Sequence, residues 1–161
     1  MLLGSIVAVE GLDGYVVAAS GDERASVGSF VRVASTQEIV GIIVGYTNTI
    51  REELIPYMHP KMQERYLPYN IDFERTHYDV LGVGTSAEKS ITIPPRIGDE
   101  VYLLTDEQVQ QFHSAHGAYY LSQKKDAIDR EVALLVVEKL QKAMPEQQRM
   151  LELAKRYIRG W

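Results

Sequence analysis

Two histidines, His113 and His116, have the spacing in this sequence that best suits metal chemistry. Three positions apart in a predicted helix, they share one face, so both imidazoles could reach the same ion. A third ligand would have to come from elsewhere in the chain, and the candidates are Asp106, His59 and His77. Histidines near the end of a helix are also common on surfaces, because the helix dipole stabilises their charged form. A metal site is therefore an alternative, and the leading interpretation assigns no cofactor.

A second group of ionisable residues, Asp72, Glu74 and Asp79, lies beside His77. Paired carboxylates can serve hydrolysis as acid and base or by holding metal ions. The spacing of these three singles out no acid–base pair, and a solvated loop and strand edge is the simpler interpretation. The sequence also lacks cysteine and any serine in the setting of a nucleophile elbow. We therefore expect no catalytic centre, and a small metal-dependent hydrolase or nuclease using His113, His116 and these acids is the alternative.

Residues 84–90, Gly-Thr-Ser-Ala-Glu-Lys-Ser, have a superficial likeness to a phosphate-binding loop. Glu88 stands where the glycine before the lysine belongs, and Val83 stands where the first glycine belongs. That loop needs a close approach of backbone N–H groups to phosphate, and an acidic side chain would repel the ligand. The segment is therefore predicted to be a hairpin turn between two strands rather than a nucleotide site.

The composition is that of an ordinary globular protein of 161 residues, 45% hydrophobic and 24% charged. The absence of cysteine excludes disulfides and thiolate metal sites and suits the cytoplasm, where we expect the protein. No stretch approaches the ~20 apolar residues of a transmembrane helix, and no basic leader precedes the first apolar segment. Residues 1–105 carry 14 acidic and 8 basic side chains, against 8 and 9 in residues 106–161. The acidic first part disfavours general binding to nucleic acid.

Short segments rich in β-branched and aromatic residues fill the first two thirds of the chain, with turn residues between them. This rhythm is typical of a small barrel, and we expect an α+β fold: a six-stranded β-barrel followed by a C-terminal helical tail of two to three helices. Gly41 and Gly45 lie inside the clearest hairpin and would permit bulges in a strongly curved sheet. Six or seven strands are predicted, at residues 6–9, 15–18, 30–33, 39–46, 77–83, 90–93 and 100–104.

Residues 50–76 interrupt the strand rhythm with three prolines and are predicted to be a partly helical insertion in a barrel domain of residues 1–105. Tyrosine and methionine are concentrated in this insertion, and both are enriched in protein interfaces. Two aromatic residues at the end of the last apolar stripe join the same set. The predicted interface residues are Tyr57, Met58, Met62, Tyr66, Tyr69, Tyr157 and Trp161.

The helical tail, residues 106–161, begins with a capping box in which Thr105 is the N-cap and Gln108 the third helical residue. The first helix is predicted to end near Gly117, a second to run over residues 119–143, and a third to open at Pro145. Apolar stripes of this kind need a surface to cover them, so the tail either folds back on its own barrel or pairs with another chain. The stripe of the third helix contains Met150, Leu153, Ala154, Tyr157, Ile158 and Trp161.

Residues 94–102 place a proline pair and a Gly-Asp before the last predicted strand, and residues 27–33, 38–43 and 81–82 supply the strands that precede it. In this order of short strands, residues 1–105 resemble the HAS-barrel domain, the small six-stranded barrel at the N-terminus of HerA-type DNA-translocating ATPases. That domain is related to the barrel of the catalytic subunits of rotary ATP synthases. In the HerA-type ATPases a motor domain with a phosphate-binding loop follows the barrel. Here helices are predicted instead, so the resemblance does not imply ATPase activity.

The leading hypothesis is a non-catalytic assembly or adaptor protein whose barrel serves protein–protein interaction or oligomerisation. The resemblance implies a setting near DNA-processing ATPases of an archaeal type, with a protein partner or self-association and no membrane. A second alternative, after the metal-dependent hydrolase, is a nucleic-acid-binding module that uses the basic side chains of the tail. These are Lys124, Lys125, Arg130, Lys155, Arg156 and Arg159.

Overall fold

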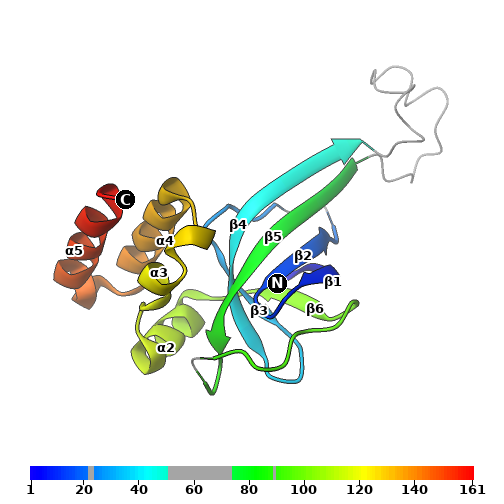
Figure 1. The fold of residues 1–161 in the computed structure, drawn as a ribbon, viewed down its shortest axis with the longest axis horizontal. Helices are drawn as coiled ribbons and strands as arrows, with labels where there is room; N and C mark the ends of the chain where they lie inside the picture. Colours follow the sequence, from blue (N-terminus) through cyan, green and yellow to red (C-terminus); the bar gives the residue numbers. More distant parts are fainter. Residues whose placement is uncertain (22–23, 51–73, 89) are drawn as a thin grey trace.

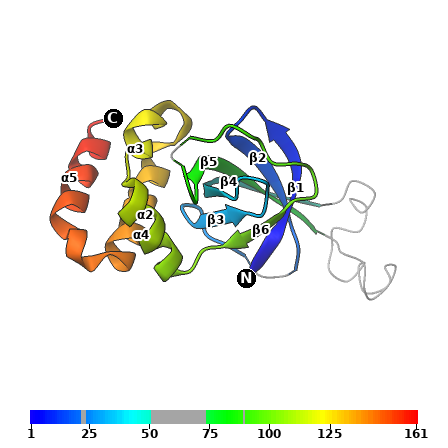
Figure 2. The ribbon, with the colours of Figure 1, turned by 90° about the horizontal axis from the view of Figure 1, so that it is seen from below.

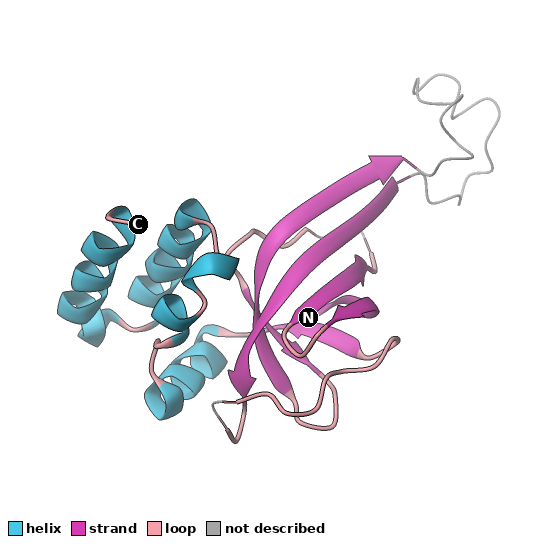
Figure 3. Ribbon diagram, in the orientation of Figure 1, coloured by secondary structure: helices cyan, strands magenta, loops and turns pink. Residues whose placement is uncertain are grey.

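The computed structural model describes residues 1–21, 24–50, 74–88 and 90–161 of the chain. Over these residues, six antiparallel strands close into a barrel and helices follow it, which confirms the expected α+β fold (Figures 1 and 3). The strands are β1 (Leu2–Glu10), β2 (Gly14–Ala19), β3 (Phe30–Val33), β4 (Ile39–Ile50), β5 (Glu74–Thr85) and β6 (Glu100–Leu103), paired in the order β1-β2-β5-β4-β3-β6. The helices are α2 (Asp106–His116), α3 (Tyr120–Gln123), α4 (Arg130–Ala143) and α5 (Gln148–Arg159), with 3-10 turns η2 (Lys125–Ala127) and η3 (Pro145–Gln147).

Gly41 and Gly45 lie at bulges in the barrel wall, as their position in a curved hairpin predicts. The register between β4 and β5 shifts at both glycines. An added Cβ would lie 2.7 Å from Val80 Cγ1 at Gly41 and 2.7 Å from Asp79 Oδ2 at Gly45, closer than van der Waals contact. The missing side chains therefore let β4 approach β5 closely where the sheet bends towards closure.

The prediction of a strand at residues 90–93 is wrong, because these residues belong to the loop between β5 and β6. The backbone N–H groups of Thr92 and Ile93 donate to Oε1 of Gln37, each at 2.8 Å, rather than to a neighbouring strand. No strand is left for them to pair with, since β6 bonds to both β1 and β3 and closes the barrel without them. The apolar residues in this segment do not mark a strand: Ile91 packs against the barrel interior and Ile93 is exposed.

Strands β4 and β5 extend beyond their predicted ends and form a two-stranded arm that projects from the barrel (Figure 1). Their paired residues continue as far as Ile50 and Glu74. The prediction of an insertion over residues 50–76 is therefore wrong at both edges, where the chain is strand. Residues 51–73 lie outside the described residues. The predicted interface residues among them are Tyr57, Met58, Met62, Tyr66 and Tyr69.

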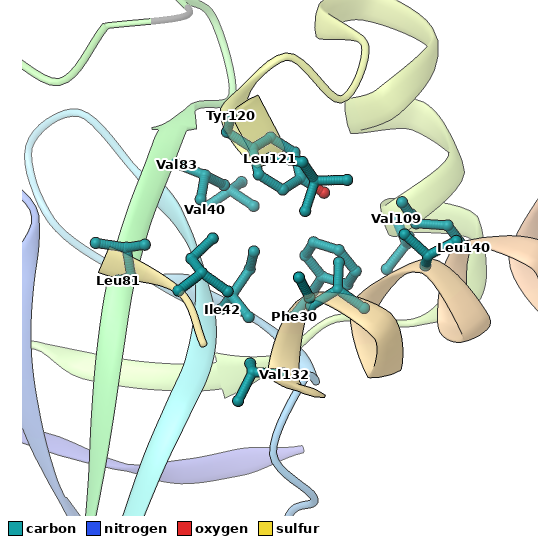
Figure 4. Packing of buried hydrophobic residues seen from close by; sticks show 14 of the residues in the cluster. Phe30, Val40, Ile42, Leu81, Val83, Val109, Tyr120, Leu121, Val132 and Leu140 are labelled. Atoms are coloured by element: carbon teal, nitrogen blue, oxygen red, sulfur yellow. The ribbon is translucent and has the colours of Figure 1, made fainter. Parts of the chain in front are cut away.

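The buried apolar side chains form two clusters, one inside the barrel and one between the barrel wall and the helices. Leu3, Val17 and Tyr78 are among the residues that fill the interior. The second cluster joins residues of β3, β4 and β5 to residues of all the helices (Figures 2 and 4). The helical tail therefore packs on its own barrel, the first of the two arrangements that the apolar stripes allowed. The wall contributes Phe30, Val40, Ile42, Leu81 and Val83 to this cluster.

The ends of the first helix are confirmed, whereas the second predicted helix is interrupted. Gln108 N donates to Thr105 Oγ1 at 3.3 Å and Thr105 N donates to Gln108 Oε1 at 2.9 Å, and the helix ends at Gly117. The single helix predicted over residues 119–143 is instead α3, η2 and α4. The chain is extended at Ile128, whose side chain is buried in the cluster between barrel and helices. This burial favours a break that the apolar periodicity did not reveal.

Gly28 lies where the segment before β3 meets α4. Its φ is +90°, and an added Cβ would lie 3.0 Å from Cβ of Leu135. A left-handed backbone costs a residue with a Cβ roughly 1–2 kcal/mol, and the close contact with Leu135 would add to this cost. Gly28→Ala should therefore lower the free energy of unfolding by about 2 kcal/mol. Gly98→Ala is the matched control, because Gly98 has a φ of +95° but no atom near an added Cβ. Urea denaturation measures both; equal losses would contradict a contribution from the α4 contact.

Candidate interaction surface

His113 lies on the buried face of α2 rather than at a site open to a ligand. Its Nδ1 is 2.7 Å from the carbonyl oxygen of Val109, and its Nε2 is 2.6 Å from the hydroxyl oxygen of Tyr120. A carbonyl can only accept, so Nδ1 carries the proton and Nε2 accepts from Tyr120. Burial lowers the pKa of His113 to about 4, against the opposing effect of the Val109 hydrogen bond. The ring is therefore neutral near pH 7, with no free lone pair for a metal ion.

His116 lies near His113 but has no free nitrogen of that ring with which to share a metal ion, because both are engaged in hydrogen bonds. Its ring packs on Phe112, with ring centroids 4.9 Å apart, and its buried Nε2 has no hydrogen-bond partner among the described residues. Of the proposed third ligands, Asp106 begins α2, His77 lies on β5 and His59 is outside the described residues. Within the part of the chain that the structure describes, no group of three or more His, Asp or Glu side chains could hold a metal ion.

Of the acidic residues considered for hydrolysis, Glu74 and Asp79 lie on β5, and the structure does not bring these two to the histidines of α2. Glu74 is near the outer end of the arm, where its Oε2 pairs with Nη2 of Arg24 at 3.0 Å and accepts from Nδ2 of Asn48 at 3.1 Å. Asp79 is exposed further along the same strand. Asp72 lies outside the described residues. Through Arg24, Glu74 therefore links the arm to the segment that follows β2.

Residues 85–88 of the segment that resembles a phosphate-binding loop form a turn at the end of β5, but the prediction of a hairpin is wrong, because residues 90–93 are not a strand. Thr85 N donates to the carbonyl oxygen of Glu88 at 2.8 Å, and Glu88 N donates to Oγ1 of Thr85 at 2.7 Å. The Thr85 side chain is buried, and its hydroxyl donates back to the same carbonyl oxygen. These backbone N–H groups are therefore satisfied within the turn instead of being directed towards an anion.

Helix α5 is the outermost helix, with α4 between it and the barrel (Figures 1 and 2). Leu151 and Ile158 are buried, whereas Met150, Leu153 and Tyr157 are exposed by 53%, 64% and 54%. At 100° per residue the three exposed side chains form one strip beside the buried edge. The predicted apolar stripe is therefore covered along one edge only. Its exposed strip, Met150, Leu153 and Tyr157, is here termed the α5 outer face.

Cationic side chains border the α5 outer face. At 100° per residue Arg149 and Arg156 lie beside Leu153, one turn before it and one turn after it, whereas Arg159 lies on the opposite side of the helix. None of these arginines forms an ion pair with another residue in the part of the chain that the structure describes. Arg149, Arg156, Leu153 and Glu152 also line a hollow of about 370 Å³. The face thus combines exposed apolar side chains with unpaired positive charge.

The two predicted interface residues of the tail differ in their surroundings. The rings of Tyr157 and Trp161 meet edge to face, with centroids 6.2 Å apart. Trp161 is half-buried against the cluster between barrel and helices, and Nζ of Lys125 lies 5.8 Å from its ring centroid. Lys124 Nζ pairs with Asp13 Oδ2 at 2.6 Å. Two of the basic side chains considered for nucleic-acid binding are therefore engaged within the protein, and Tyr157 is the aromatic residue left exposed.

A second exposed apolar group lies on the loop between β5 and β6. Ile97 is 72% exposed, and Ile93 is also exposed. The loop is held at Gln37, as described above, and Gly98 N donates to the carbonyl oxygen of Ile6 at 2.8 Å. This loop contains the proline pair on which the family resemblance depends, and sequence reasoning gave it a structural role alone. The signal available in the sequence was the place of the two isoleucines beside loop residues, Ile93 before the proline pair and Ile97 before Gly98.

The closed barrel limits how another protein could bind. Within the barrel each strand has a neighbour on both sides, whereas in the arm β4 beyond Ile43 and β5 before His77 pair only with each other. A partner that binds the barrel outside the arm must therefore use side chains. Among the helices of the described residues, none is long and apolar enough to cross a membrane.

No protein-family model matches this chain, and no curated protein matches it. The resemblance of residues 1–105 to the HAS barrel therefore stays a prediction. The closed six-stranded barrel of the structure is compatible with it.

Proposed function

We propose that the protein is a non-catalytic assembly or adaptor protein, in which the barrel is the scaffold and the α5 outer face binds a protein partner. The observation that carries this proposal is the exposure of Met150, Leu153 and Tyr157 beside the unpaired Arg149 and Arg156. Tyrosine, methionine and arginine are enriched at interfaces, where they supply contact area and directed hydrogen bonds. The engagement of both His113 nitrogens weighs against the metal-dependent hydrolase.

The charge on α5 indicates the character of the partner. Two copies of α5 packed outer face to outer face would bring arginines against arginines, and like charges at an interface are unfavourable. A partner that offers apolar side chains flanked by carboxylates would instead complement both features. A protein other than a second copy of α5 therefore fits this face better.

The resemblance of the barrel makes DNA-processing ATPases the first partners to test. The cytoplasm is the compartment we propose for this function, since the chain has no cysteine and such ATPases act on DNA. The resemblance supports this choice by analogy of fold, and the α5 outer face supplies the physical reason to expect a protein partner.

The double variant Leu153→Asp/Tyr157→Asp should abolish partner binding without unfolding the protein, because both side chains are exposed. We expect binding to a purified HerA-type ATPase from the same organism to weaken at least tenfold in calorimetry. The matched control is Leu12→Asp, which adds a charge at an exposed leucine in the β1–β2 turn, away from α5. A wild-type protein that is strictly monomeric in light scattering and retains the same proteins from a lysate as the double variant would contradict the proposal.

Duplex DNA provides the test of the nucleic-acid alternative. Binding to phosphates through the predicted basic residues of the last helix, Lys155, Arg156 and Arg159, would depend steeply on salt. We expect no binding at 50 mM salt. Salt-dependent binding that is lost in Arg156→Gln/Arg159→Gln would favour the nucleic-acid-binding module over the adaptor.

A further inference from the structure

A cavity of about 250 Å³ lies between the barrel wall and α2, away from the α5 outer face. Its apolar lining comes from Val40 on β4, Leu104 before α2 and Phe112 within α2. Its charged lining comes from Arg32 on β3 and Glu38 in the turn before β4. The volume equals that of about eight water molecules at ~30 Å³ each, which is close to the number of non-hydrogen atoms in a leucine molecule. The cavity therefore suits a small ligand with one apolar and one charged part.

The guanidinium of Arg32 is held in place on two sides. Its Nη1 donates to Glu38 Oε1 at 3.0 Å, and its Cζ lies 4.7 Å from the ring centroid of Tyr102. The Tyr102 ring is itself fixed by a hydrogen bond from its hydroxyl to the Glu100 carboxylate. Nη2 and Nε of Arg32 have no hydrogen-bond partner among the residues that the structure describes. A preorganised cation with free donors thus lines the cavity.

Glu38 is held in an unfavourable backbone conformation. Its φ is +52°, and it is the one residue other than glycine with a positive φ in the described part of the chain. Its N–H donates to the Ser35 carbonyl oxygen at 3.0 Å, so Glu38 closes the turn between β3 and β4. Glycine or asparagine would occupy such a position with less strain. The glutamate brings a carboxylate to the cavity, where Oε2 also accepts from Oγ of Ser86 at 3.4 Å. Strain of this kind is common at binding sites.

We propose that this cavity binds a small zwitterion, a free α-amino acid with an apolar side chain. Its carboxylate would take the free donors of Arg32 and its ammonium group would pair with Glu38. Its side chain would lie on Val40, Leu104 and Phe112. A ligand with a carboxylate alone would be repelled by the Glu38 carboxylate, and a ligand with an ammonium group alone would be repelled by the Arg32 guanidinium. A zwitterion satisfies both charges, and the exchange is cheap because the Arg32–Glu38 pair is partly exposed to water.

Titration of the full-length, isotope-labelled protein with L-leucine, followed by NMR, tests this proposal. We expect saturable shifts at residues around the cavity, with a Kd on the order of 0.1–1 mM. N-acetyl-L-leucine lacks the ammonium charge and L-leucinamide lacks the carboxylate, and each should bind at least tenfold more weakly. No saturable shift with leucine, or equal binding of the three compounds, would overturn the proposal.

Substitutions separate a binding role from a structural one. Glu38→Gly relieves the positive φ, so it should keep or raise the melting temperature while it weakens leucine binding at least tenfold. Arg32→Gln should weaken binding to a similar extent. Lys139→Gln is the control, because Lys139 lines a separate cavity beside α4. Leucine binding that survives Glu38→Gly unchanged would overturn the assignment of the ammonium group to Glu38.

Discussion

Replacing Phe30 with alanine is expected to lower the free energy of unfolding by about 3–5 kcal/mol, as large-to-small changes of aromatic core residues do. Phe30 is the first residue of β3, is 4% exposed and belongs to the cluster between the barrel and the helices (Figure 4). Its ring meets the rings of His113 and Tyr120 edge to face, at centroid distances of 5.0 and 6.5 Å. One side chain of the barrel therefore supports the packing of two helices, and alanine would leave a cavity between them.

Denaturation followed by tryptophan fluorescence and by far-ultraviolet circular dichroism measures this change. Trp161 lies in the helical part and reports its packing, whereas the dichroism reports all strands and helices. Because the cluster joins both parts, we expect a single transition that shifts as a whole in Phe30→Ala. Ile97→Ala, at an exposed side chain, is the control and should stay within about 0.5 kcal/mol of wild type. Separate transitions for the two signals in the wild-type protein would contradict a shared core.

The sequence predicts those features of the fold that depend on neighbouring residues. The capping box at Thr105 and Gln108, the end of α2 at Gly117 and the bulges at Gly41 and Gly45 all follow from local backbone chemistry. The false strand at 90–93 has a different origin. Its isoleucines fit a strand locally, but the barrel closes through β6, and local alternation carries no information about how many strands a barrel needs.

The candidate sites were less predictable, because each depends on which face the fold covers. Helical spacing put His113 and His116 on one face, but the burial of His113 depends on Tyr120, which belongs to a different helix. Likewise the apolar arc of α5 is wider than its contact with the protein, and the sequence does not show which edge stays exposed. The cavity at Arg32 could not be found from the sequence, since the positive φ of Glu38 at a non-glycine residue has no local signal.

Acid should destabilise the protein through His113. The pKa of this ring is about 4 in the folded protein, chiefly because of burial, against 6.5 for an unperturbed histidine. Between these values the unfolded chain binds more protons than the folded one. The contribution to stability is therefore fully present above pH 6.5 and is lost as the pH falls from 6.5 to 4. The difference in pKa corresponds to a loss of roughly 3 kcal/mol in the free energy of unfolding.

The double variant His113→Leu/Tyr120→Phe isolates this loss, because it removes both partners of the hydrogen bond and leaves neither buried group unpaired. Urea denaturation at pH 7 and at pH 4.5 should show a smaller loss of stability in the double variant than in the wild type, by about 2–3 kcal/mol. His77→Gln, at a half-buried histidine on the β5 arm, is the matched control and should keep the wild-type dependence.

Tyr120→Phe alone leaves Nε2 of His113 unpaired, so it should cost about 1–3 kcal/mol at pH 7 and still lose stability in acid. Parallel pH profiles for the wild type and the double variant would contradict the prediction. They would show that His113 binds a proton as readily in the folded protein as in the unfolded chain.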